Sequence, residues 1–258
     1  MKQTFSTLLG IAVCLLFTLN GTAQKKTMTW TTKSEKAKLL AQKGAGYMMN
    51  IEFAQAYDQF KQALELDPDF TVVLTLMANL SDGAQKKMYA DKALASSAKK
   101  TPGEQLFASL AKADNKPEDN RKIWAQLRDM FPDGSFIGFF DVLSRATPEE
   151  QFAAAKEYVV KFPDVAAIYN ILGYGYMQVK KDTAAAKTYF EKYVKLYPEG
   201  CNPYDSFGEF YFNTGDMANA EKYYRIALEK YPFNISSIDK LKAIKETKDK
   251  ESDKVKSN

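Results

Sequence analysis

The sequence has 258 residues, 45% hydrophobic and 26% charged, so it can bury a sizeable core and is not globally disordered. It contains no histidine, which rules out a Ser-His-Asp or Cys-His triad built from this chain and removes the commonest zinc ligand. The 36 basic and 32 acidic residues leave a net charge of +4, too small and too dispersed to indicate a nucleic-acid partner. Two cysteines are too few for a disulfide framework.

Residues 1–23 are typical of a secretory signal peptide. Lys2 precedes a continuous apolar run over 8–17, and small residues follow at 21–23. This order predicts cleavage after Ala23 and an exported protein, periplasmic or secreted. The run is shorter than the roughly 20 residues of a spanning helix, which disfavours an uncleaved anchor. A lipoprotein at Cys14 is disfavoured because Val13 is bulky. No later stretch approaches spanning length, so no membrane span is expected after cleavage.

An irregular lead-in is expected at 24–33, and a repeated unit follows it. The segments FKQALELDP, FEKYVKLYP and YRIALEKYP resemble one another and end at Pro68, Pro198 and Pro232. Weaker versions end at Pro132 and Pro163, and Pro102 either ends a sixth unit or starts a helix. The spacings between these six prolines are 34, 30, 31, 35 and 34 residues, which indicates one supersecondary unit repeated about six times.

Each clear unit is predicted to be two helices joined by a turn. In the last one, residues at helical spacing mark one face of each helix: Tyr204, Phe207, Gly208 and Tyr211, then Ala220, Tyr224, Ala227 and Leu228. Gly215-Asp216 marks the turn between them. Glycine and alanine let two helix backbones approach closely, and the aromatic rings fill the space beside them. The same order recurs after Gly44 and after Gly173.

These residues resemble the tetratricopeptide repeat, a helix-turn-helix unit of 34 residues. The resemblance is specific in three units and degenerate between Thr71 and Pro163. It implies an all-α, right-handed α-solenoid at 34–234, with units at about 37–70, 71–102, 103–133, 134–164, 165–200 and 201–234. A narrow apolar stripe predicts a C-terminal capping helix at 235–247, and a charged flexible tail is expected at 248–258.

Three helix starts are predicted from capping residues. Thr101 and Thr147 each precede Pro-x-Glu, a capping box with proline at the first helical position, and Asn202 precedes Pro-x-Asp.

Cys201 would be the single cysteine of the mature chain. It is expected to be either buried or paired between molecules, and burial is favoured because free cysteine behaves as a small hydrophobe.

The resemblance implies that the first helix of each unit lines a concave groove that binds protein segments. The groove residues predicted on this basis in the fifth and sixth units are Asn170, Tyr174, Gln178, Asn202, Asp205, Glu209, Phe212 and Asn213. Asp205 and Glu209 lie four apart and are expected to form an ordinary solvated face. In the first unit, the groove would contain Met48 and Met49. It would have alanines at the positions where a groove for C-terminal carboxylates carries lysine and asparagine.

The function predicted from these features is a non-enzymatic protein-protein interaction module, or adaptor, of the cell envelope. Its partner would be a protein or peptide, and the oligomeric state is left open. No catalytic residue, cofactor or metal site is expected, because the sequence has neither a glycine-rich phosphate loop nor a metal-ligand cluster. The alternative is a structural subunit of a larger envelope or secretion-related assembly. An enzyme would need a carboxylate-only site such as Asp205 with Glu209.

Overall fold

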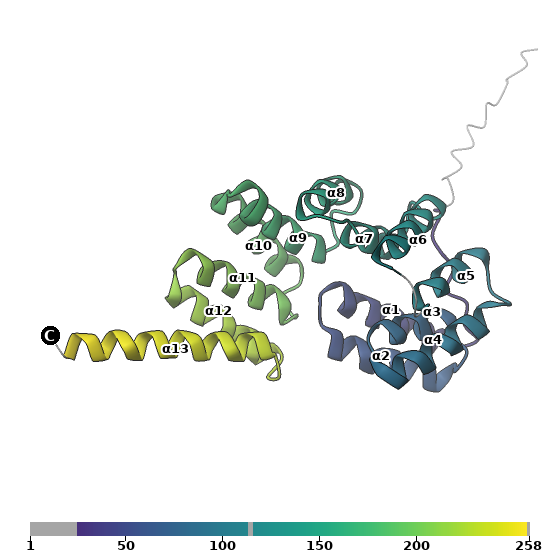
Figure 1. Cartoon of the computed structure of the whole chain (residues 1–258), viewed down its shortest axis with the longest axis horizontal. Coiled ribbons are helices and arrows are strands. Elements are labelled where there is room, and N and C mark those ends of the chain that lie inside the picture. The colour runs from purple at the N-terminus through teal and green to yellow at the C-terminus, as the bar shows by residue number, and fades with distance from the viewer. Residues whose placement is uncertain (1–24, 113–115, 257–258) are drawn as a thin grey trace, which may run out of the picture.

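The computed structural model describes residues 25–112 and 116–256, so the predicted signal peptide lies outside the described residues (Figure 1). Within those ranges the chain forms thirteen α-helices and no strand. The α-helices are α1 Glu35–Met49, α2 Phe53–Leu66, α3 Thr71–Asn79, α4 Gly83–Ser97, α5 Pro102–Ala108, α6 Pro117–Met130, α7 Ser135–Leu143, α8 Pro148–Lys161, α9 Ala167–Gly175, α10 Thr183–Leu196, α11 Asn202–Thr214, α12 Met217–Lys230 and α13 Ile235–Lys256. A 3-10 helix (η1, Ser109–Ala111) and a π-helix (η2, Tyr176–Lys180) extend α5 and α9.

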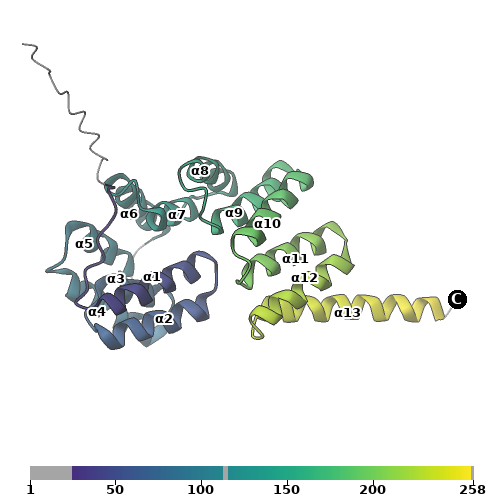
Figure 2. The same cartoon turned by 180° about the vertical axis from the view of Figure 1, so that it is seen from behind.

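The first twelve helices follow one another as six pairs, α1–α2 to α11–α12, in the order of the predicted repeats (Figures 1 and 2). Successive pairs pack side by side along a curved array, which confirms the predicted all-α solenoid. Pro102 starts α5 rather than ending α4, so the open question about this proline is settled in favour of a helix start.

Glycine lets the two helices of a pair approach closely. A Cβ atom on Gly44 would lie 2.5 Å from the ring of Phe60, and one on Gly208 would lie 2.9 Å from the ring of Tyr224. Phe60 and Tyr224 are fully buried at these contacts. Because real Cβ contacts are never this short, glycine is required at both positions to seat the aromatic ring.

The lead-in (residues 25–33) is not helical, yet it is tied to three repeats. The Lys26 amide donates to the Asp133 carboxylate, and the Thr31 amide and hydroxyl both donate to Glu104, at 2.7 and 2.8 Å. Asp67 accepts from the Thr32 hydroxyl at 2.6 Å. Asp133 and Glu104 belong to the third repeat and Asp67 to the first, and the Trp30 ring lies 5.6 Å from that of Phe136 in the fourth, so the lead-in contacts three repeats.

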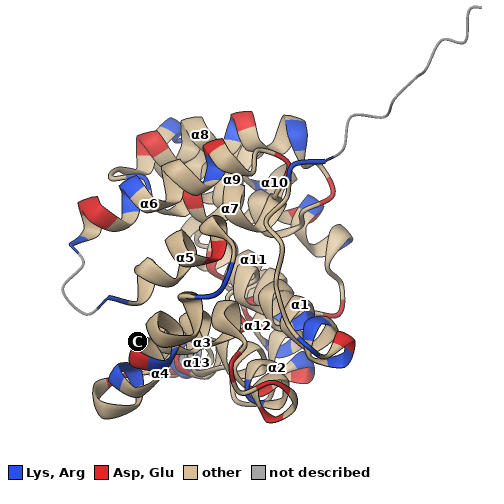
Figure 3. Ribbon diagram, turned by 90° about the vertical axis from the view of Figure 1, so that its right-hand side faces the viewer, with Lys and Arg blue, Asp and Glu red and all other residues tan. Residues whose placement is uncertain are grey.

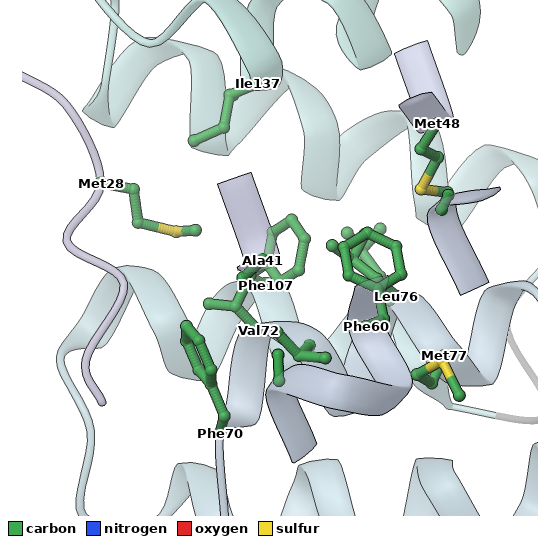
Figure 4. Packing of buried hydrophobic residues seen from close by; sticks show 14 of the residues in the cluster. Met28, Ala41, Met48, Phe60, Phe70, Val72, Leu76, Met77, Phe107 and Ile137 are labelled. Carbon is green, nitrogen blue, oxygen red and sulfur yellow. The ribbon is translucent and has the colours of Figure 1, made fainter. Parts of the chain in front are cut away.

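One apolar cluster joins the lead-in to the first four repeats. Met28 of the lead-in lies with Phe60, Val72, Phe107 and Ile137, which come from four successive repeats (Figure 4). All five side chains are buried. This shared core explains how the sequence-degenerate middle of the chain still packs as helix pairs.

Two helix boundaries differ from the sequence predictions. α13 continues to Lys256, beyond residue 247, so part of the predicted flexible tail is helical. Lysine and glutamate are frequent in this stretch, and both are good helix formers. α11 begins at Asn202 with Cys201 at the N-cap, so Asn202 is not the capping residue. Thr101 and Thr147 do cap α5 and α8, each accepting from the backbone N–H of a glutamate three residues on.

Candidate functional site

Three of the predicted groove residues lie together on the fifth repeat. Asn170 and Tyr174 on α9 and Gln178 on η2 line one hollow of about 210 Å³. Its apolar walls include Leu143, Phe152 and Val179, together with Ile51 from the first repeat. Because the first and fifth repeats line the same hollow, it faces the inside of the curved array.

Asn170 provides an unused hydrogen-bond acceptor beside this hollow. The side chain is only 5% exposed, and its Oδ1 atom has no hydrogen-bond partner among the described residues. A buried amide oxygen without a partner costs free energy of about 1–3 kcal/mol. The side chain therefore keeps an acceptor that no described residue uses.

Tyr174 connects the fifth repeat to the sixth. Its hydroxyl donates to Oε2 of Glu209 at 2.5 Å. Burial, followed by the Glu209 carboxylate, raises the pKa of this hydroxyl well above its ordinary value. Glu209 is therefore not a free groove charge, because its carboxylate already accepts a strong internal hydrogen bond.

The backbone around the hollow departs from regular helix at two places. Residues 176–180 form the π-helix η2, which supplies Gln178 and Val179. Ile51 has φ of 62°, a left-handed conformation that is a genuine outlier for a β-branched residue. π-helices and strained residues both concentrate at functional sites. Two independent departures therefore meet at the same hollow.

The sixth-repeat residues are mostly engaged inside the protein. Asn202 is buried and its amide donates to the Tyr193 hydroxyl at 3.0 Å. Asp205 is also buried and accepts from the Ser237 hydroxyl of α13 at 2.5 Å. Asp205 thus does not belong to a solvated face, because α13 covers it. Burial raises the pKa of its carboxyl despite the serine hydrogen bonds.

The two remaining predicted residues lie near the end of α11. Phe212 is half-buried, with the Lys240 ammonium of α13 4.5 Å from its ring centroid. Asn213 is exposed. The structure therefore places Asn170, Tyr174 and Gln178 around one hollow, and leaves Asn202 and Asp205 in contacts that hold repeats together.

The first repeat contributes to a second, larger hollow of about 520 Å³. Ala45 and Met49 of α1 line it, opposite Thr29 and Trp30 of the lead-in and Phe136 of α7. Met48 is buried in the core instead. The lead-in thus covers part of the first-unit groove, which the sequence did not predict.

A contact missed by sequence analysis lies next to Ile51. Glu52 is 4% exposed and binds residues about 145–150 positions later in the chain, among them Tyr197 and Cys201. Cys201 is buried, as the burial alternative predicted. The sequence around Glu52 contains no motif that indicates such a distant contact. The one available signal was a turn, Asn50-Ile51-Glu52, that lacks glycine.

The described residues contain neither a metal-binding cluster nor a membrane-spanning helix. No group of three or more Cys, Asp or Glu side chains is arranged to hold a metal ion in this part of the chain. None of the described helices is both long and apolar enough to cross a membrane. On the side of the molecule seen in Figure 3, basic and acidic residues are interspersed over the helices.

Family comparisons identify two of the repeats directly. Two tetratricopeptide-repeat models match the chain, one over residues 169–200 and the other over 203–232. These are the fifth and sixth helix pairs. Among curated proteins, none matches the sequence of this chain.

Several solved structures resemble the fold at low sequence identity. Yeast Tom70 is 13% identical with a TM-score of 0.54, over 85% of this chain and 51% of that chain. Cut9–Hcn1, a hetero-tetramer of the APC/C, is 16% identical with a TM-score of 0.50, over 81% of this chain and 43% of that chain. PilW, a type IV pilus biogenesis factor, is 15% identical with a TM-score of 0.48, over 82% and 99%.

Proposed function

We propose that this protein, which contains tetratricopeptide repeats, is a non-enzymatic adaptor of the cell envelope. It binds a segment of another protein in the hollow lined by its fourth and fifth repeats and by Ile51 of the first. The observation that carries this proposal is the Oδ1 atom of Asn170, buried without a partner beside that hollow. The envelope location rests on the signal peptide predicted at residues 1–23.

The size of the hollow favours a protein segment over a small cofactor. Its volume of about 210 Å³ lies below the roughly 300–1,000 Å³ of small-molecule pockets. It can take an apolar side chain against Phe152 and Val179. A neighbouring backbone N–H of the partner would donate to Asn170, and Gln178 can add a further hydrogen bond at the exposed rim.

The test is photo-crosslinking in intact cells that make the protein natively. A benzoylphenylalanine placed at position 178, which lines the hollow, should give a discrete adduct with one partner protein. The same probe at Lys180 is the matched control, because that residue is exposed on the same helix but does not line the hollow. Equal adducts from both positions would argue against the hollow as the binding site.

A substitution at Asn170 sharpens this test. Asn170→Leu removes the unpaired acceptor and keeps a similar side-chain volume, so the unfolding free energy should stay the same or rise. Adduct formation from position 178 should fall by up to about tenfold, because one hydrogen bond is worth about 0.5–1.5 kcal/mol. Urea unfolding and adduct yield are measured on the same variant. A loss of both stability and binding would indicate a purely structural asparagine.

One observation favours a structural subunit as a second candidate. Phe233, Ile235 and Ile238 lie close together in sequence at the α12–α13 turn and are 74%, 72% and 44% exposed. Apolar exposure of this kind is typical of surfaces covered in an assembly. The triple change to serine should leave the helix content intact and release the protein from a native envelope complex on size-exclusion chromatography.

A further inference from the structure

The turn between α1 and α2 reaches across to the junction of the fifth and sixth repeats (Figures 1 and 2). Oε1 of Glu52 accepts from the backbone N–H of Cys201 at 2.7 Å and of Asn202 at 3.4 Å. Oε2 of Glu52 accepts from the Tyr197 hydroxyl at 2.7 Å. One buried carboxylate thus satisfies three donors around the start of α11.

Asn50, on the other side of this turn, makes a matching contact. Its Oδ1 accepts from the Tyr193 hydroxyl at 3.0 Å, and that hydroxyl in turn accepts from the side chain of Asn202. All three residues are buried. The hydrogen bonds on both sides of Ile51 therefore connect the first repeat to the α10–α11 junction.

Ile51 sits between these two anchored residues. It holds a φ of 62°, and its side chain is 51% exposed and lines the hollow with Asn170 and Tyr174. A β-branched residue keeps this backbone conformation only where its surroundings impose it. Glu52 and Asn50 supply that constraint, so the position of Ile51 depends on their contacts across the array.

We propose that residues 50–52 form a latch: when closed, it completes the partner-binding hollow with Ile51, and when released, it opens that hollow. This inference rests on the proposed function, because it assigns a regulatory element to the same site. A partner that contacts both Ile51 and the fifth repeat binds the closed form better, so it shifts the population toward closure. Conversely, any change that releases Glu52 weakens partner binding.

Cys201 supplies a built-in reporter of latch position. Its side chain is 6% exposed, and its backbone N–H is bound by Glu52. Burial, followed by the Glu52 charge, raises the pKa of the thiol to about 12, which suppresses the reactive thiolate. Release of the latch removes the Glu52 carboxylate from this thiol and uncovers it. Its alkylation rate should therefore rise on opening.

The first measurement is the rate at which a maleimide labels Cys201 in the full chain carrying Cys14→Ser. Glu52→Ala should raise this rate at least tenfold, with helix content unchanged by circular dichroism. Tyr197→Phe, which removes a single hydrogen bond, should give a smaller increase. Glu65→Ala is the matched control, because Glu65 is an exposed glutamate of α2, the helix that begins directly after Glu52. An unchanged rate in both Glu52→Ala and Tyr197→Phe overturns the latch.

The second measurement uses the benzoylphenylalanine probe at position 178. Ile51→Gly keeps the backbone conformation available and removes the side chain from the hollow. It should leave the labelling rate within twofold of the parent and reduce adduct yield at least fivefold. Glu52→Ala should reduce the yield as well. If neither variant reduces the adduct yield, the latch does not control partner binding and this part of the proposal is overturned. An absence of adducts in the parent contradicts the proposed function, and the labelling rates then decide on the latch alone.

Discussion

The fifth and sixth repeats and the second to fourth repeats build the same helix pairs with different contacts. The former match tetratricopeptide-repeat models and pack aromatic rings against glycines 16 or 17 residues earlier, as Tyr224 does against Gly208. In the fourth repeat the related pair, Gly138 and Tyr158, is 20 residues apart and less tight. A buried Asp141 that binds Arg128 and Arg145 supplements the packing there. The architecture therefore depends on filled space between paired helices more than on any one residue spacing.

The largest effects should come from large-to-small changes in the two cores. Phe190→Ala in the fifth repeat and Phe107→Ala in the third should each lower the unfolding free energy by about 3–5 kcal/mol. Both side chains are fully buried. Urea unfolding measures the two costs. If Phe107→Ala lowers the unfolding free energy by less than half as much as Phe190→Ala, the middle repeats are packed more loosely than the fifth and sixth.

The glycine contacts should separate the two regions more clearly. Gly208→Ala should cost about 1–3 kcal/mol, because the new methyl would lie 2.9 Å from the Tyr224 ring. Gly138→Ala should be nearly neutral, since a contact of 3.1 Å needs only a small shift and alanine favours a helix by about 1 kcal/mol. Gly46→Ala is the stabilising control in the same assay, because its new methyl would lie more than 4 Å from every described atom outside its own stretch of helix.

A third pair of changes tests which tyrosine hydroxyls matter. Tyr193→Phe should cost about 1–3 kcal/mol, because its hydroxyl binds both Asn50 and Asn202. Tyr224→Phe should be close to neutral, because the Tyr224 hydroxyl is buried without a partner in the described part of the chain. Thermal and urea unfolding should rank the two variants in this order. Equal costs would mean that the contact between distant repeats contributes little.

The smallest expected effect is a pH dependence at Asp205. Burial raises the pKa of this carboxyl, with Glu209 adding to the shift and Ser237, Ser236 and Lys240 opposing it. Asp205 therefore makes its full contribution to stability at pH values below the ordinary carboxyl pKa. That contribution is lost as the pH rises through the raised pKa of the folded state. The unfolding free energy of Asp205→Asn relative to the parent should increase between pH 4 and pH 7. A difference that stays flat would contradict the raised pKa.

Helix pairing was predictable because periodicity and glycine-aromatic spacing are local. The place of Asn170 and Tyr174 on the first helix of the fifth repeat was predictable, whereas the hollow that they line with Ile51 was not. Asp205 was misassigned because its charge suggested solvent, whereas α13 covers it and Ser237 binds it. The contacts of Glu52 could not be foreseen, since nothing near it indicates partners about 145–150 residues away.

The contact of residues 50–52 with the α10–α11 junction changes how the array should unfold. A linear solenoid is stabilised only between neighbours, so its end repeats fray independently and its contact order is low. Here the first repeat is hydrogen-bonded to the fifth and sixth, and the lead-in contacts the first, third and fourth. Amide protons of α1 and α2 should consequently exchange with solvent in one cooperative opening together with those of α10 and α11. The price of this cooperativity is slower folding, because distant segments must meet before the structure closes.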